Sequence, residues 1–342
     1  MRRLTFIAAL MSSTVVVGAD EAKPQVMVGT IDLFGLRQHS ESEIRSSLKI
    51  KEGDPFDREQ TSAAVAELKK LPGVKQTTLA PITTDGSGRI HLFVGVQEED
   101  AVGFVLRDKP TGETRLPAPL AQIFLDFSNA LGPAVRSGKD REDDTQGHAL
   151  DTDPGMRKAE ETAVAQMREE VGTVKAVLRT SASVDDRRAA AWLLGYAPDK
   201  KSVTDALVEA ARDPDSSVRN NATRALGAIA VLAGLQPELG IRIDPSVFIA
   251  MLDSVDWTDR NKAAFVLEGL TKSKPPELLQ QLRAHALPDL IEMARWKSTG
   301  HALSAALILG RIAGWSDEKT MATCEWGKSD REAIIAAASS SR

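Results

Sequence analysis

The sequence Val184-Asp-Asp-Arg-Arg-Ala-Ala-Ala-Trp-Leu-Leu-Gly195 recurs in related form as Ser217-Val-Arg-Asn-Asn-Ala-Thr-Arg-Ala-Leu-Gly227. Both stretches have arginine near the start, small residues in the middle and a leucine-glycine pair at the end. Two further copies lead to Gly269 and Gly310, so that successive glycines are 32, 42 and 41 residues apart. Repetition at such a period is typical of chains that stack helices against one another.

Each copy has the same pattern of small and apolar residues before its glycine. An alanine precedes each glycine by five positions, namely Ala190, Ala222, Ala264 and Ala305. An apolar residue also precedes it by two positions, and these offsets share one helical face on which a neighbouring helix can approach closely. A second apolar helix is expected before each copy, at 174–178, 203–211, 247–252 and 278–294. The repeating unit is therefore predicted to be a pair of helices whose second member ends at the glycine.

The clearest copy runs from Asp213-Pro-Asp-Ser-Ser-Val-Arg219 to Leu226-Gly227 and resembles the short bacterial kind of HEAT repeat. In that family, a turn aspartate and the arginine that opens the second helix form a polar ladder between units. The resemblance assigns this ladder to three pairs, namely Asp215 with Arg219, Asp186 with Arg187, and Asp259 with Arg260. The fourth copy, at 297–302, has neither residue. Tetratricopeptide and ankyrin signatures are not found, and a solenoid of four to five helix pairs is predicted over 161–338.

The N-terminal residues predict export from the cytoplasm. Met1-Arg-Arg3 is basic, Leu4 to Met11 is a short apolar run, and Val17-Gly-Ala19 places small residues before a cleavage site between Ala19 and Asp20. This pattern is typical of a secretory signal peptide at 1–19, and the alternative is an uncleaved amphipathic start to the fold. No segment approaches the roughly 20 apolar residues of a membrane-spanning helix.

The region 26–99 predicts a small domain with the element order βααββ. Its first helix is expected to begin at Ser40 with Glu43 three places later, and the second to begin at Asp57 and stop at Pro72-Gly73. Strands are predicted at Ile31–Leu33, at 74–82 and at 90–96, with a hairpin turn at Asp85-Gly-Ser-Gly88 between the last two.

Several motifs in this region together resemble a POTRA domain, the periplasmic module that precedes outer-membrane barrels. They are Gly35, the element Leu48-Lys-Ile-Lys-Glu-Gly-Asp-Pro-Phe56, the helix end Leu68-Lys-Lys-Leu-Pro-Gly-Val74, and a last strand closing at Val96-Gln-Glu-Glu99. The resemblance implies a mixed three-stranded sheet with both helices on one face. By the same analogy, the strand at 74–84 is an open edge to which an extended partner segment can add. In the alternative, Lys75 and Pro81 blunt this edge and it binds nothing.

Residues 100–160 are predicted to be a linker that contains one amphipathic helix and an acidic loop. The apolar face of that helix comprises Leu120, Ile123, Phe124, Phe127 and Leu131. The loop gathers the carboxylates Asp143, Asp144, Asp151 and Asp153 around His148. These five are weak candidates for a calcium or zinc site. An EF-hand is disfavoured because the glycine comes one place early and Thr162 stands where a bidentate glutamate belongs, so a solvated loop is the preferred interpretation.

Composition and the missing motifs favour binding over catalysis. The chain has 342 residues, a net charge of −5, 42% hydrophobic and only 4% aromatic residues, which suits alanine-rich helix seams and disfavours nucleic-acid partners. No hydrolase, zinc-protease or phosphate-loop motif is present, and no cofactor is expected. The single Cys324 and the five tryptophans are expected to be packing residues.

The sequence as a whole therefore predicts an α+β chain, with a POTRA-like domain followed by an all-α solenoid. The predicted function is a non-catalytic, protein-binding scaffold of the bacterial envelope, in the periplasm or at the periplasmic face of the outer membrane. It would bind outer-membrane or secreted proteins through its sheet edge and its solenoid groove. The alternative is a metal-dependent or lyase-type enzyme centred on Asp143, Asp144 and His148, since some bilin lyases have HEAT-like repeats.

Overall fold

The computed structural model describes residues 25–83, 88–138, 141–325 and 328–341, and they divide into two compact units. The first unit comprises the described residues up to Gly103 together with Ser254–Trp257. The second comprises Phe104–Asp253 and the described residues from Thr258 onward. The predicted signal peptide, with its cleavage site at Ala19 and Asp20, lies outside the described residues.

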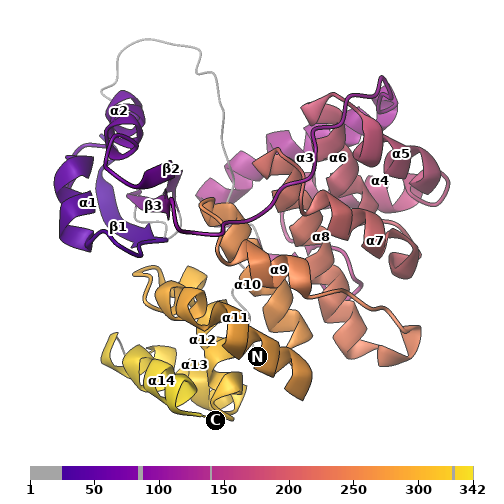
Figure 1. The fold of residues 1–342 in the computed structure, drawn as a ribbon. Coiled ribbons are helices and arrows are strands. Elements are labelled where there is room, and N and C mark those ends of the chain that lie inside the picture. The colour runs from indigo at the N-terminus through magenta and orange to yellow at the C-terminus, as the bar shows by residue number, and fades with distance from the viewer. Residues whose placement is uncertain (1–24, 84–87, 139–140, 326–327, 342) are drawn as a thin grey trace. The chain divides into compact units, whose positions relative to one another are not determined.

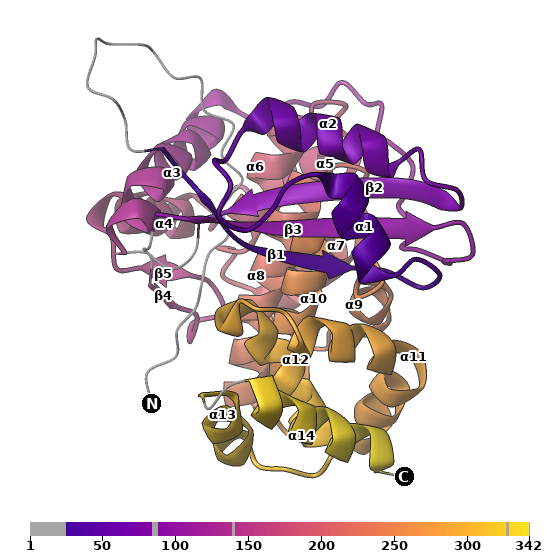
Figure 2. The same cartoon turned by 90° about the vertical axis from the view of Figure 1, so that its left-hand side faces the viewer.

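The first unit contains a three-stranded sheet and two helices in the predicted order βααββ. The elements are β1 (Val28–Phe34), α1 (Glu41–Leu48), α2 (Arg58–Leu68), β2 (Val74–Ile82) and β3 (Ile90–Glu98). The strand order is β1-β3-β2, with β1 parallel and β2 antiparallel to β3, so the sheet is mixed. Figures 1 and 2 show both helices over one face of this sheet. The predicted hairpin turn falls largely on residues 84–87, outside the described residues.

Local sequence signals explain where the two helices begin. Ser40 and Glu43 form a capping box, in which Glu43 N donates to Ser40 Oγ at 3.3 Å and Ser40 N donates to Glu43 Oε2 at 2.8 Å. Asp57 accepts from Glu59 N at 2.8 Å and so caps α2. Gly73 follows with a φ of 75°, which allows the chain to turn from α2 into β2.

The core of this unit lies between the sheet and the helices. Alternate strand residues meet the buried helix residues Ile44, Leu48 and Leu68 there. The strand residues are Ile31, Leu33, Leu92, Val94 and Val96. Because strand side chains alternate between faces, the strict alternation of β3 supplies one apolar face to the helices.

The second unit is helical. Its elements are α3 (Ala118–Ser137), α4 (Pro154–Gln166), α5 (Val171–Thr180), α6 (Val184–Leu194), α7 (Lys200–Ala210), α8 (Ser216–Leu235), a 3-10 turn (Pro237–Leu239), α9 (Ser246–Met251), α10 (Trp257–Leu270), α11 (Pro276–Ala294), α12 (Thr299–Ile312), α13 (Asp317–Glu325) and α14 (Lys328–Ser340). The first residue of α10, Trp257, is assigned to the first unit. Consecutive helices pack as pairs, α5 on α6, α7 on α8, α11 on α12 and α13 on α14. Since α6 also packs on α8, the pairs stack as a solenoid. None of the helices among the described residues is long and apolar enough to cross a membrane.

The repeat glycines differ from the sequence prediction at Gly227, whereas Gly195, Gly269 and Gly310 stand within two residues of a helix end. Gly227 lies inside α8, which continues to Leu235, and Gly269 and Gly310 lie inside α10 and α12. A Cβ at Gly227 would lie 2.4 Å from the Phe265 ring, and one at Gly310 would lie 2.1 Å from Thr320 Oγ1. The glycines therefore allow neighbouring helices to approach closely, both inside α8 and near the ends of α10 and α12.

Residues 104–160 belong to the same compact unit as the helices that follow, whereas the sequence indicated a linker. The apolar face of α3 buries Leu120, Ile123 and Phe127, and the Phe127 ring lies 4.8 Å from that of Trp192 on α6. The acidic loop forms a short hairpin of β4 (Glu142–Asp143) and β5 (Leu150–Asp151). This region therefore extends the helical unit toward the N-terminus.

Candidate functional site

The strand β2 is an open edge of the sheet in the first unit. Proline has no N–H to give to a sheet ladder, so Pro81 must face away from β3, and by alternation so do the main chains of Leu79 and Thr77. Outside the strand ladders, no main-chain hydrogen bond involves these two residues within the described part of the chain, and β2 has β3 as its one neighbour in the sheet. The exposed Lys75 and Pro81 flank this short open stretch.

The opposite edge, β1, is covered by side chains and by a neighbouring turn. Ile31 N donates to Glu52 Oε1 at 3.1 Å, and Ile31 O accepts from Arg45 Nη2 at 3.1 Å. The β1 residue Val28 also exchanges main-chain hydrogen bonds with Gly53 and Asp54 at 2.8 Å. Of the two edges, β2 is the one that can accept an additional strand.

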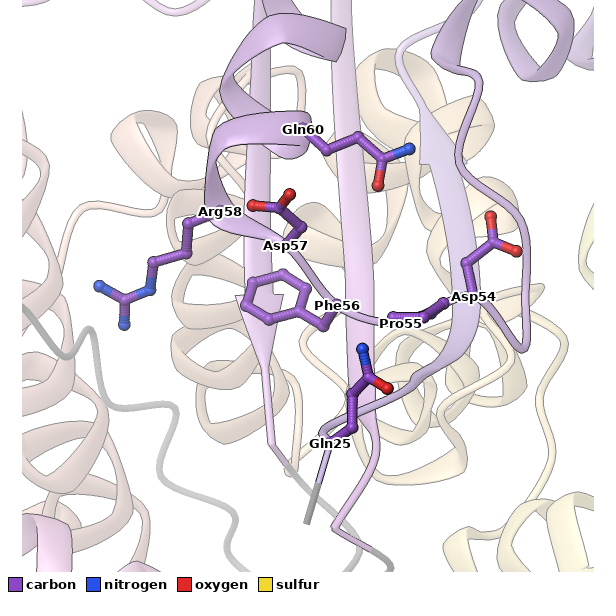
Figure 3. Close-up of a pocket in the computed structure, with 7 residues that line it drawn as sticks. All are labelled: Gln25, Asp54, Pro55, Phe56, Asp57, Arg58 and Gln60. Atoms are coloured by element: carbon purple, nitrogen blue, oxygen red, sulfur yellow. The ribbon is translucent and has the colours of Figure 1, made fainter. Parts of the chain in front are cut away.

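A surface hollow of about 500 Å³ lies at the start of α2 (Figure 3). Its carboxylates have local roles, since Asp54 accepts from Lys51 N at 2.7 Å and Asp57 caps α2. Figure 3 shows the side chains of Arg58 and Asp54 pointing to opposite sides. The lining residues are Gln25, Asp54, Pro55, Phe56, Asp57, Arg58 and Gln60. They do not converge on a point where a substrate would react.

The arginine ladder of the helical unit is present, but its partners differ from those assigned from the sequence. Arg187 donates to both carboxylate oxygens of Asp213, at 2.9 and 3.0 Å. Arg219 pairs with Asp259 at 2.9 Å, while its expected partner Asp215 caps α8 by accepting from Ser217 N at 2.9 Å. Each of these two arginines thus reaches an acid of the next repeat. For Arg219, the nearer acid Asp215 is needed at the N-terminus of α8, whereas α6 is capped by Ser183 and Asp186 pairs with Arg115.

The remaining ladder residues also find partners outside their own turn. Asp186 meets the exposed Arg115 at 3.4 Å, and Arg260 donates to Glu292 at 2.9 Å. Arg311 was not identified from the sequence. It lies at the end of α12, outside the ladder position, where it pairs with Asp317 at 2.8 Å and donates to Thr271 Oγ1 at 2.8 Å. The sequence does contain a signal for this pair, because Arg311 directly follows Gly310 and Asp317 stands six residues after the arginine. Four of the arginines are almost fully buried, which supports a structural role; they are Arg187, Arg219, Arg260 and Arg311.

The weak metal candidates lie near one another in sequence but have separate roles. Asp143 accepts from Thr145 N and Oγ1, at 2.9 and 2.7 Å, and these hydrogen bonds lower its pKa. Asp153 caps α4, and Asp151 Oδ1 accepts from Asp153 N at 2.6 Å. Asp144 O accepts from Gly147 N at 3.0 Å within the hairpin loop. In the part of the chain that the structure describes, no three histidine, cysteine or acidic side chains converge to hold a metal.

The fifth candidate, His148, belongs to a buried polar cluster between the hairpin and the solenoid. Lys200 Nζ lies 3.2 Å from His148 Nδ1 and donates to Gly195 O at 2.7 Å. Burial and the neighbouring Lys200 lower the pKa of His148 to about 4, and burial lowers the pKa of Lys200 to about 7. His148 is therefore neutral at physiological pH.

Glu160 on α4 completes this cluster. It accepts from Asp151 N at 2.6 Å and from Tyr196 Oη at 3.3 Å, and it is fully buried. Burial raises its pKa to about 7, and the charge of Asp151 adds to this, although the hydrogen bond from Asp151 N opposes it. Glu160 could not be singled out from the sequence, since nothing in an amphipathic helix marks one glutamate as buried.

The cavity beside this cluster is small. It measures about 20 Å³, enough for roughly one water molecule, and is lined among others by His148, Trp192 and Arg224. Such a space does not admit a substrate. The perturbed pKa values of the cluster therefore reflect burial of polar groups at a packing interface.

The other candidate residues have packing environments. Trp192, Trp257 and Trp296 are buried, Trp315 is half-buried, and Trp326 lies outside the described residues. Cys324 is a buried free thiol. The four tryptophans that the structure describes do not form an exposed aromatic groove.

The fold and these surfaces define a helical-repeat protein with a small sheet-containing unit, and a match to one family model agrees with the repeats. Residues 173–238, which span most of α5 and all of α6, α7 and α8, match the family model of HEAT repeats. A search among curated proteins found no match.

Two similar solved structures are both engineered or designed proteins. One is an engineered protein with 18% identity, covering 65% of this chain and 95% of its own, at a TM-score of 0.36. The other is a designed armadillo repeat protein in complex with the peptide (KR)4, with 14% identity, 66% and 99% coverage, and a TM-score of 0.38.

Proposed function

We propose that this protein is a non-catalytic, protein-binding scaffold of the bacterial cell envelope. The observation that carries the proposal is the combination of stacked HEAT-type helix pairs with an uncovered sheet edge at β2. Stacked repeats present extended surfaces, and an uncovered edge offers main-chain donors and acceptors to an extended segment. In the proposal, partner proteins bind at both surfaces.

The envelope location rests on the sequence of residues 1–20 and on the POTRA-like motifs of residues 26–99. By that resemblance, the partners are outer-membrane or secreted proteins, and the scaffold acts in their assembly or secretion. Expression of the full-length gene, followed by cell fractionation and intact-mass spectrometry of the product, tests the location. The expected product is periplasmic and begins at Asp20, whereas an intact chain in the cytosol would contradict the proposal.

Strand addition at β2 can be tested with a photoreactive residue at the exposed position Gln76. Leu79→Pro removes an outward N–H, whereas Leu79→Ala shortens the same side chain and keeps that N–H. We expect in-cell cross-linking to fall severalfold in Leu79→Pro and to persist in Leu79→Ala. Equal cross-linking in the two variants would show that partners do not pair with this edge.

A further inference from the structure

The segment of residues 104–116 is extended and crosses the turns of two successive helix pairs. It leads into α3 (Figure 1) and belongs to the helical unit. Gly112 N donates to Thr180 O, and Ala182 N donates to Gly112 O, both at 2.8 Å, which forms a parallel bridge. One repeat further, Arg107 N donates to Arg212 O at 2.7 Å.

The acceptors for this segment are carbonyls at helix C-termini. Thr180 is the last residue of α5, and Arg212 follows the end of α7. The last carbonyls of a helix have no partner within it and carry its negative dipole end. The segment therefore supplies main-chain N–H donors where the repeats leave acceptors.

Arg107 adds a charged anchor to these main-chain contacts. Its Nη2 donates to Asp213 Oδ2 at 2.6 Å and to Leu178 O at 2.9 Å, and its Nη1 lies 3.3 Å from Glu209 Oε1. Asp213 is fully buried, which opposes its ionisation, but hydrogen bonds from Arg187 and Arg107 hold its pKa below the ordinary value. A planar guanidinium fits this combination of two carboxylates and a carbonyl.

Gly112 sets a second requirement, five residues after Arg107. A Cβ at this position would lie 2.6 Å from Thr180 O, a main-chain atom that cannot move independently of its helix. Any side chain here would break the parallel bridge. The turns after α5 and α7 therefore accept a segment that has arginine at one position and glycine five residues later.

The buried carboxylate of the site has partners besides the segment. Asp213 keeps both oxygens bonded to Arg187 and also accepts from Asp215 N at 2.9 Å. Between Phe104 and Arg107, the segment leaves the side chains of Val105 and Leu106 exposed. Polar contacts, more than apolar burial, hold this part of the segment, so its removal leaves Asp213 paired with Arg187 and makes the carbonyls of Thr180 and Arg212 available to other donors.

We propose that the turns after α5 and α7 form a binding site for extended segments that carry arginine and, five residues later, glycine. Residues 104–116 are the chain's own occupant of this site, and a partner segment with the same pattern binds by replacing them. This inference rests on the proposed role as a scaffold and names the chemistry of one partner.

Fluorescence anisotropy with a labelled peptide of residues 103–116 tests the site. The full-length chain is compared with its double variant Arg107→Ala/Gly112→Val, in which the internal segment no longer competes. We expect at least tenfold tighter binding to the variant than to the unchanged chain. Peptides with Arg107→Ala or Gly112→Val should bind the double variant at least tenfold more weakly. Equal binding of the peptide to both proteins, or of all peptides to the variant, would overturn the proposal.

Hydrogen exchange on the unchanged chain provides an independent test if the double variant folds poorly. Replacement requires the segment to leave while the helices stay folded, so the Gly112 and Ala182 amides should exchange at least tenfold faster than those inside α6. Equal protection would mean that the segment leaves only on global unfolding, and exchange of occupants would be ruled out. The cross-linking experiment at β2 does not depend on residues 104–116. Failure of the segment-binding site can therefore be distinguished from failure of the proposed scaffold function.

Discussion

Arg219 Nε donates to both carboxylate oxygens of Asp259, at 2.9 and 3.0 Å, although Asp259 lies 40 residues further along the chain. Both side chains are buried, and Arg219 Nη1 also donates to Asp213 O at 2.8 Å. Because Asp213 itself holds Arg187, each arginine connects its own turn to the next repeat. The ladder therefore links three successive helix pairs.

This arrangement predicts a large cost for removing one member of a buried pair. Asp259→Ala leaves the guanidinium of Arg219 uncompensated and should lower the free energy of unfolding by about 3–5 kcal/mol. Asp186→Ala is the matched control, because its partner Arg115 is 75% exposed, and should cost less than about 1 kcal/mol. Urea denaturation of both variants measures the difference. Similar losses would show that the pair between repeats is not a main source of stability.

Asp215 provides a second prediction, since its carboxylate caps α8 instead of pairing with Arg219. It accepts from Ser217 N and Val218 N, at 2.9 and 3.3 Å. Asp215→Ala should lower the free energy of unfolding by about 1 kcal/mol, whereas Asp215→Asn retains an acceptor and should cost little. If Asp215→Asn were as costly as Asp215→Ala in thermal denaturation, charge and not capping would explain the effect.

Much of the fold could be predicted from local sequence patterns. The capping box at Ser40, the cap at Asp57 and the strict alternation of β3 each depend on residues close in sequence, and the βααββ order follows from them. The ladder partners could not be predicted in the same way. Whether Arg219 selects Asp215 or Asp259 depends on which acid is needed for capping and on how the repeats stack.

The candidate site was less predictable than the fold. Asp151 and Glu160 are nine residues apart, and only the packing of β5 on α4, together with Tyr196 just after α6, shows that they share a buried site. Arg107 stands alone in an apparent loop, and its role depends on turns more than 70 residues away. Such contacts leave no periodic signal in a single sequence.

The glycines inside the helices yield a third prediction. A Cβ at Gly227 would meet the ring of Phe265 at 2.4 Å, so Gly227→Ala overpacks the seam and should cost about 1–3 kcal/mol. Gly234 lies on the same helix with nothing within 4 Å of an added Cβ. Gly234→Ala should therefore stabilise by up to about 1 kcal/mol through helix propensity. Differential scanning calorimetry should show a lower Tm for Gly227→Ala and a higher Tm for Gly234→Ala. Two shifts of the same sign would refute the role of Gly227 in close packing.

Glu160 predicts a dependence of stability on pH. Its pKa rises from 4.5 in the unfolded chain to about 7 in the fold, so the folded state holds more protons between these values. The stability from protonated Glu160 is full below about pH 4.5 and is lost as pH rises through 7. Glu160→Gln should therefore be more stable than the unchanged chain by about 2–3 kcal/mol at pH 8, and similar to it at pH 4.5. Urea titrations at the two pH values measure this, and a constant difference would contradict the assignment.

His148 predicts the opposite dependence on pH over an overlapping range. Its pKa falls from 6.5 to about 4 in the fold, so the unfolded chain binds the extra proton and stability is lost as pH falls from 6.5 through 4. Between pH 4.5 and 6.5 the contributions of His148 and Glu160 largely cancel in the unchanged chain. His148→Gln should therefore expose the Glu160 contribution, with stability decreasing from pH 4.5 to 6.5, and Glu160→Gln should expose that of His148, with stability increasing. If both single variants kept the same pH profile as the unchanged chain, neither group would titrate as the buried cluster requires.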